Sequence, residues 1–137
     1  MEIILWRHAD AEDGAPDLAR KLTSKGRKDA ERVGAWLRKR LPRDFHLVAS
    51  PAVRAQQTAE ALGAKIETDK RLAPGASVAD IVKAAQREGV VVIVGHQPDL
   101  GEAIAHLVGA KDVRLQKGAL WWIEDNLVRA VVSPDLL

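Results

Sequence analysis

The chain has 137 residues, of which 47% are hydrophobic and 29% are charged, and its 21 Lys and Arg nearly balance its 19 Asp and Glu. This composition is typical of a globular protein, and the length predicts one domain over residues 1–137. The absence of cysteine excludes disulfides, thiolate metal sites and a cysteine nucleophile. The net charge of +2 argues against nucleic-acid binding. The longest strictly apolar run, Val90 to Val94, is too short to cross a bilayer, and no secretory signal is recognisable, so we expect a cytoplasmic protein.

An apolar stretch rich in isoleucine, residues 2–6, predicts a buried strand at the start of the chain. Residues 10–21 are polar and contain glycine and proline, which indicates a loop. Thr23 is expected to cap a helix that ends before Pro42, because a proline disfavours helical backbone in the residue before it. That helix has an apolar stripe at spacings of three and four residues, formed by Ala30, Val33, Leu37 and Leu41.

A second strand is predicted over Phe45–Ala49. Ser50 then resembles an N-cap, with Pro51 in the first position of a helix that runs to about Leu62. Residues 65–68 are expected to form a short edge strand.

A capping-box pattern that begins at Ser77 predicts a third helix, which ends at Gly89. The most hydrophobic strand is expected over residues 90–94, in the middle of the sheet. Another helix is predicted from Asp99 to Gly109.

Residues 119–123 and 127–132 flank a polar tripeptide and predict a C-terminal antiparallel hairpin. The alternation of strands and helices before it predicts a three-layer α/β/α fold, with a mostly parallel sheet covered by helices on both faces. Ligands of such sheets bind beyond the carboxyl ends of the strands. The side chains that follow the strands are therefore the candidates for function.

Four side chains in such positions predict an anion site. Arg7 and His8 follow the first strand, and His96 follows the strand over residues 90–94. Arg54 lies near the start of the helix after the second strand, and helical side chains lean toward the N-terminus, so it should point back at the strand ends. Arginine matches phosphate oxygens with its planar fork of donors, and a neutral histidine can attack phosphorus as a nucleophile.

Four sequence elements resemble those of the histidine phosphatase superfamily, in the same order and at similar spacing from residue 3 to about residue 100. Leu5–Ala9 resembles the Arg-His-Gly signature, with alanine in place of glycine. Leu22–Gly26 resembles the Leu-Thr-x-x-Gly element, and Ser50–Thr58 resembles the more specific Ser-Pro-x-x-Arg-Ala-x-Gln-Thr element. Gly95-His96 is similar to the second histidine of the family. The Arg-His-Ala variant, and a length with no room for helical insertions, resemble the small bacterial phosphohistidine phosphatases of SixA type.

The resemblance implies that His8 is a nucleophile that becomes transiently phosphorylated, while Arg7, Arg54 and His96 hold the phosphoryl oxygens. It also implies that water hydrolyses the phosphohistidine intermediate without a metal or cofactor, because the arginines neutralise the charge. His8 must be neutral to attack, and we expect the surrounding cations to disfavour its protonation. Arg20 precedes the Leu-Thr element and is a candidate for substrate recognition, with a solvated loop arginine as the alternative interpretation.

One departure from the family pattern concerns the acid that usually protonates the leaving group. The segment where the resemblance would place this acid, residues 71–77, contains no carboxylate. An alkyl phosphate needs such a donor, whereas the P–N bond of phosphohistidine is intrinsically labile, so the absence favours phosphohistidine as the substrate. Four carboxylates of the polar loop could substitute for the acid: Asp10, Glu12, Asp13 and Asp17.

The leading hypothesis is therefore a metal-independent phosphatase that acts on phosphohistidine in a protein, such as a phosphotransfer domain, in signal transduction. A phosphatase of small phosphate esters or sugar phosphates would use the same machinery and is the first alternative. A non-catalytic module that binds phosphate as an adaptor is the second. Neither nucleic acid nor a membrane is expected as a partner, and the sequence does not indicate an oligomeric state.

Overall fold

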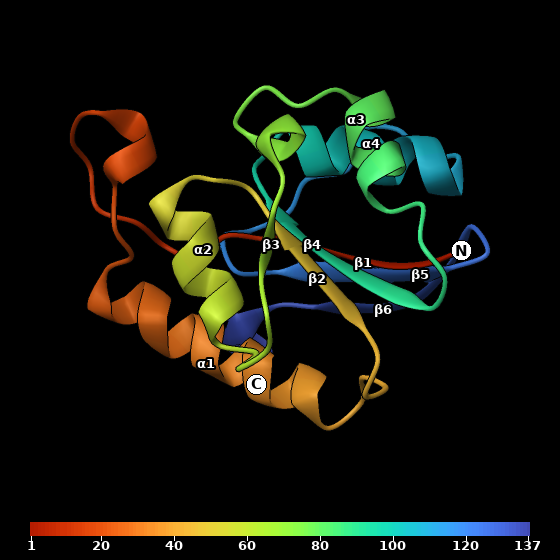
Figure 1. Cartoon of the computed structure of the whole chain (residues 1–137), viewed down its shortest axis with the longest axis horizontal. Coiled ribbons are helices and arrows are strands. Elements are labelled where there is room, and N and C mark those ends of the chain that lie inside the picture. Colours follow the sequence, from red (N-terminus) through yellow and green to blue (C-terminus); the bar gives the residue numbers. More distant parts are fainter.

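The computed structural model describes residues 1–137 and shows a six-stranded sheet between two layers of helices (Figure 1). The strands are β1 (Glu2–Arg7), β2 (His46–Ala49), β3 (Glu67–Thr68), β4 (Val90–Gly95), β5 (Leu120–Glu124) and β6 (Leu127–Val132). The helices are α1 (Ser24–Arg38), α2 (Val53–Glu60), α3 (Val78–Ala84) and α4 (Asp99–Val108). Short 3-10 turns lie at Asp17–Ala19, Lys70–Leu72 and Pro134–Leu136. No helix has the length and apolar character that a membrane span requires.

The strand order in the sheet is β3-β2-β4-β1-β5-β6. The first four of these strands are parallel, and β5 and β6 are antiparallel additions beside β1. Every residue of β4 is buried, and the strand has parallel partners on both sides, which confirms its predicted place in the middle of the sheet. The predicted C-terminal hairpin is also confirmed, and it turns at Asp125 and Asn126, which both have positive φ.

Two hydrophobic cores lie on opposite faces of the sheet. Strand β1 contributes to both, because alternate side chains of a strand point to opposite faces. Ile4 and Trp6 pack in the core beneath α1 and α2, whereas Ile3 and Leu5 pack in the core beneath α3 and α4. Figure 1 shows the corresponding helix pairs on the two sides of the sheet. The predicted three-layer α/β/α architecture is therefore confirmed.

The start of the second helix differs from the prediction. Helix α2 begins at Val53, and its N-cap is Ala52, whose backbone is still extended (φ −60°, ψ 138°). The interpretation of Ser50 as an N-cap and of Pro51 as the first helical residue was therefore wrong. The Ser50 hydroxyl does accept a hydrogen bond from the backbone N–H of Ala52, but its other contact is with a histidine, as described below.

Three helices end earlier than the sequence pattern indicated. Helix α1 ends at Arg38, and beyond it the Leu37 carbonyl is shared by the backbone N–H groups of Arg40 and Leu41. Helix α2 ends at Glu60, and helix α3 ends at Ala84 rather than near Gly89. The predicted cap of α3 is confirmed, because the Ser77 hydroxyl accepts from the backbone N–H of Asp80. Helix α4 and its glycine C-cap, Gly109, also agree with the prediction.

The carboxyl edge of the parallel strands brings distant parts of the chain together. Strands β1 and β2 both pair with β4 in parallel as far as their last residues. The residues that follow immediately therefore leave the sheet at one edge: His8 after β1, Ser50 after β2 and His96 after β4.

Candidate active site

His8 is held rigidly at this edge by its own backbone. Its N–H donates to the Gly95 carbonyl at the end of β4, and its carbonyl accepts from the N–H of Gly118, both at 3.0 Å. The Nδ1 atom of its ring lies 2.7 Å from the Ala9 carbonyl oxygen. A carbonyl oxygen can only accept, so the ring proton is on Nδ1. The Nε2 atom of neutral His8 consequently carries a lone pair and no proton.

Arg54 places its guanidinium against that lone pair. Its Nε–H donates a hydrogen bond to His8 Nε2 at 3.3 Å, and the arginine is only 4% exposed. Its two other nitrogens donate to Asp17, one to the backbone carbonyl at 2.8 Å and one to the carboxylate at 3.1 Å. Arg20 also donates to the Asp17 carboxylate, at 3.1 Å. Asp17 therefore links Arg20 to the buried arginine, although Arg20 itself has no direct bond to His8.

His96 lies beside His8, with 5.3 Å between the ring centroids and a tilt of 54° between the ring planes. Its Nε2 is 2.7 Å from the hydroxyl oxygen of Ser50. Its Nδ1 is buried and has no hydrogen-bond partner in the protein.

Arg7 completes the cluster from the last position of β1. One of its terminal nitrogens donates to the Leu115 carbonyl at 2.7 Å, and its buried Nε has no partner. Burial, and next the charge of nearby Arg54, lowers the pKa of Arg7. Buried polar atoms without partners are rare in folded proteins, so an unpartnered guanidinium N–H and an unpartnered imidazole nitrogen beside a second guanidinium indicate a site for an anion.

Both histidines are neutral near pH 7. The pKa of His8 is lowered to about 4, chiefly by burial; the hydrogen bond to the Ala9 carbonyl opposes this, and the charges of the nearby arginines act in the same direction as burial. Burial also lowers the pKa of His96 to about 3, with smaller contributions from His8 and the arginines. We expected the cations to keep His8 neutral. They act in that direction, but removal of the ring from water has the larger effect.

Comparison with known proteins agrees with this geometry. The family model described as the histidine phosphatase superfamily (branch 1) matches residues 3–75. The chain belongs to this superfamily. It is 34% identical to the phosphohistidine phosphatase SixA homolog of Haemophilus influenzae, over 82% of this chain and 80% of that protein. It is 30% identical to phosphohistidine phosphatase SixA of Escherichia coli, over 78% of this chain and 74% of that protein.

The fold of this histidine phosphatase matches a solved structure along nearly its whole length. The structure of the protein histidine phosphatase SixA in complex with tungstate superposes with a TM-score of 0.83 and covers 99% of both chains, at 24% identity. The predicted superfamily, its SixA-type branch and the phosphatase class of enzyme are therefore confirmed.

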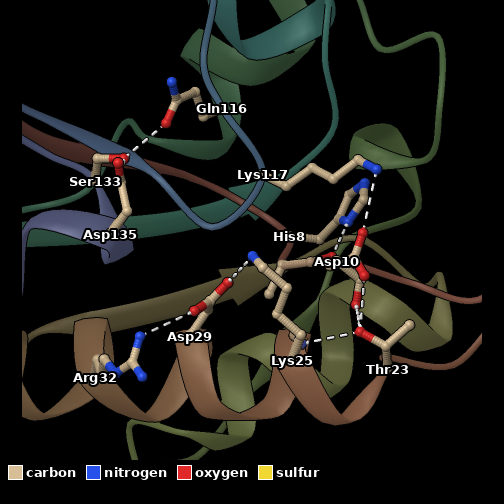
Figure 2. A network of polar contacts seen from close by, with 12 residues as sticks. His8, Asp10, Thr23, Lys25, Asp29, Arg32, Gln116, Lys117, Ser133 and Asp135 are labelled. Atoms are coloured by element: carbon tan, nitrogen blue, oxygen red, sulfur yellow. Dashed lines mark hydrogen bonds and ion pairs between the residues drawn. The ribbon is translucent and has the colours of Figure 1, made fainter.

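The Leu22–Gly26 and Ser50–Thr58 elements, which resemble those of the superfamily, form hydrogen bonds to the chain segments that follow His8. The Thr23 hydroxyl caps α1 by accepting from the N–H of Gly26 and donates to the carboxylate of Asp10. Figure 2 shows this carboxylate between Thr23 and Lys117. A Cβ atom on Gly26 would lie 2.0 Å from the Asp10 carbonyl oxygen, so a side chain there would push the loop away from α1.

Helix α2 supports the same loop with two further side chains. The Thr58 hydroxyl accepts from the N–H of Ala9 at 3.0 Å, and the Gln57 side chain accepts from the N–H of Leu22 at 2.8 Å. In the Ser50–Thr58 element, Arg54 therefore contacts the histidine, whereas Gln57 and Thr58 hold the segments on either side of the loop.

The carboxylates near the site differ in their surroundings. Asp69 pairs with Arg71 beside the segment that lacks an acid, and Asp99 accepts from the backbone N–H groups of Gly75 and Ala76 in that segment. Of the four loop carboxylates, Asp17 is the one bonded to Arg54, whereas Asp10 is bonded to Thr23 and Lys117. Hydrogen bonding to Arg54 is the main cause that lowers the pKa of Asp17. Asp17 is therefore ionised at neutral pH.

A cavity of about 720 Å³ adjoins the site on the side of α4. Arg7 lines it, together with residues from the start of α4 and from segment 112–116. His8, Arg54 and His96 do not line this cavity, so it lies beside the reactive centre rather than over it.

Ser50, which the sequence pattern predicts as a helix cap, contacts His96 instead. The signal was available, because Ser50 follows its strand directly, in the same position as His8 and His96. The Ser-Pro pattern instead favoured the interpretation of Ser50 as a helix cap. Asp17 was one of four candidate carboxylates in the loop, and its bond to Arg54, which only the structure shows, distinguishes it from the others.

Proposed function

We propose that this chain is a metal-independent phosphatase that removes the phosphoryl group from phosphohistidine in a protein, by way of a phosphohistidine on His8. The observation that carries the proposal is the lone pair of His8 Nε2, which the Ala9 carbonyl leaves unprotonated and which faces the guanidinium of Arg54. A fixed nucleophile beside a cation meets the main requirement of phosphoryl transfer, which is positioning with charge stabilisation.

In the proposed reaction His8 Nε2 attacks phosphorus, and the bond from phosphorus to the leaving nitrogen breaks. The electron pair of that bond goes to the leaving imidazole of the substrate, which takes up a proton from solvent. Arg7 and Arg54 neutralise the charge on the transferring phosphoryl group, and His96 donates a hydrogen bond to it. Water then attacks phosphorus, which releases phosphate and restores His8. Arg20 contacts the substrate from the loop, next to Asp17.

The electrostatics of Asp17 favour a phosphoramidate over an ester. Because Arg54 keeps Asp17 ionised, this carboxylate is a poor proton donor near neutral pH. An alkoxide leaving group needs such a donor, whereas the labile P–N bond of phosphohistidine tolerates its absence. The names of the SixA relatives point to the same substrate class, with a phosphotransfer domain as the protein that carries it. A cytoplasmic location stays a prediction.

The first test compares phosphate release from a histidine-phosphorylated protein and from a set of small phosphate esters, without added metal. We expect release from the phosphorylated protein, and a loss of at least about 10³-fold in the His8→Ala variant, because nucleophile removal typically has effects of this size or larger. The Arg71→Ala variant, which alters an exposed arginine paired with Asp69, serves as the control that keeps activity. Residual activity of His8→Ala within about tenfold of the wild type refutes the nucleophile. Release from neither substrate supports the adaptor alternative.

The Asp17→Asn variant separates phosphohistidine from small esters as the substrate. If no proton donor is needed, phosphate release from phosphohistidine changes by less than about fivefold, because the substitution keeps an oxygen that Arg54 can meet. Rates with a phosphoprotein and with an ester are measured side by side. A loss on the ester of about 10²-fold, the size expected for a general acid, together with faster wild-type turnover of esters, would move the assignment to the small-molecule alternative.

A further inference from the structure

The buried contact between Ser50 and His96 has no part in the reaction as described so far. Ser50 is fully buried, and its hydroxyl oxygen lies 2.7 Å from His96 Nε2. The two residues are 46 positions apart in the sequence, and the pairing of β2 with β4 brings them together.

The hydrogen bonds around Ser50 determine which way its proton points. The backbone N–H of Ala52 donates to the Ser50 oxygen at 3.2 Å. The bond from Ala52 uses one of the two acceptor lone pairs of the hydroxyl. Its single proton has one acceptor within hydrogen-bond distance, Nε2 of His96, and a buried hydroxyl proton is costly to leave unpaired. In this arrangement Nε2 accepts, and the proton of the neutral His96 ring must be on Nδ1.

The Nδ1 atom of His96 is the nitrogen that the protein leaves without a partner. An N–H group there meets no acceptor in the protein, whereas the oxygens of a phosphoryl group are acceptors. The two histidines thereby carry their protons on the same atom but present opposite chemistry. His8 presents the bare Nε2 as a nucleophile, and His96 presents Nδ1–H as a donor.

We propose that Ser50 is a positioning residue, whose hydroxyl proton holds His96 in the Nδ1-protonated tautomer so that His96 donates a hydrogen bond to the phosphoryl group transferred to His8. The inference rests on the proposed function, because it assigns His96 a role in that reaction. Without the hydroxyl, the ring proton is free to move to Nε2. Nδ1 would then direct a lone pair at the phosphoryl oxygens, which repel it.

The tautomer itself is measurable without any substrate. In the full chain labelled with ¹⁵N-histidine at pH 7, long-range ¹H–¹⁵N correlation spectra distinguish the protonated ring nitrogen from the bare one. The signals of His96 are assigned from their loss in the His96→Gln variant. We expect the proton on Nδ1 in the wild type and a shift toward Nε2 in Ser50→Ala. A wild-type His96 protonated on Nε2 overturns the proposal, as does a tautomer that Ser50→Ala leaves unchanged.

Activity provides the second readout. Ser50→Ala is expected to lower kcat by about 10- to 100-fold, somewhat less than the loss of a whole oxyanion donor, and Ser50→Thr, which keeps a hydroxyl, should recover most of it. The matched control is Ser77→Ala, which also removes a hydroxyl that accepts from a backbone N–H near a helix start but which contacts no histidine. An unchanged kcat in a folded Ser50→Ala overturns the proposal. If Ser50→Ala does not fold, the wild-type tautomer and the Ser50→Thr variant still test the proposal.

A His8→Ala variant that keeps turnover would refute the proposed function, and the tautomer measurement is independent of that result.

Discussion

A charged side chain lies at each end of β1, and the two differ in how completely the protein satisfies their hydrogen bonds. At the first residue, the Glu2 carboxylate accepts from the indole N–H of Trp122 at 2.7 Å and from Arg129 at 2.8 Å. At the last residue, Arg7 is bonded to one carbonyl, keeps a buried Nε without a partner, and lies near Arg54. The difference indicates what each end does. A paired charge stabilises the fold, whereas Arg7, which has no carboxylate partner and lies near a second guanidinium, suits an anionic ligand.

Of the changes that test this contrast, the substitution of Arg7 is expected to have the largest effect, on catalytic activity. Arg7→Ala removes a charged donor that the protein itself leaves partly unsatisfied, so we expect kcat/KM to fall by about 10²- to 10³-fold. Arg7→Lys should recover only part of this loss, because lysine keeps the charge but not the planar fork. Steady-state kinetics with a histidine-phosphorylated protein provides the measurement. A loss below tenfold would place the charge stabilisation elsewhere in the cluster.

The next largest effect is on stability as a function of pH. The pKa of His8 is about 4 in the folded chain and about 6.5 in an unfolded one, so below pH 6.5 the unfolded state binds more protons. Stability is therefore present above pH 6.5 and is lost as the pH falls toward 4, by about 3 kcal/mol for His8 over the whole range. His96, with its pKa of about 3, acts in the same direction.

Urea denaturation at pH 7 and at pH 5 measures this loss above the range in which Asp10, Asp17 and Asp69, with their lowered pKa values, titrate. The His8→Asn variant should show a smaller difference between the two pH values. Equal stability of the wild type at pH 7 and pH 5 would contradict the burial of neutral imidazoles at this end of β1.

The smallest effect is expected at the opposite end, on stability alone. Glu2→Ala leaves the indole N–H of the buried Trp122 without its acceptor and should reduce the free energy of unfolding by about 1–2 kcal/mol. Glu2→Gln keeps an acceptor and should recover most of it. The exposed partner Arg129→Ala should change stability by less than about 1 kcal/mol. Thermal or urea denaturation reports these values, and all three variants should keep phosphatase activity. A large loss of activity in any of them would contradict the assignment of a purely stabilising role to the Glu2 end of β1.

Much of the fold follows from local patterns. The apolar strand over residues 90–94 and the helix from Asp99 to Gly109 were predictable, because a continuous apolar run and a left-handed glycine cap depend on a few neighbouring residues. The start of α2 was not predictable, because the motif Ser50-Pro51 also occurs at helix starts, where serine is the N-cap and proline is the first helical residue. The Ser50 hydroxyl instead contacts His96, which follows β4.

The motifs of a histidine phosphatase could be recognised in the sequence, and so could the position of its four candidate residues near the carboxyl ends of parallel strands. In the structure Arg7 is the last residue of β1, His8 and His96 directly follow their strands, and Arg54 lies in the first turn of α2. The tertiary structure shows that the Ala9 carbonyl fixes the proton of His8 on Nδ1 and that Nδ1 of His96 has no partner in the protein. It also shows that burial more than charge keeps His8 neutral, and that Asp17 rather than its neighbours contacts Arg54. The physical reason is distance along the chain. The bonds of Arg54 to His8 and of Ser50 to His96 each join residues 46 positions apart, and no local periodicity encodes them.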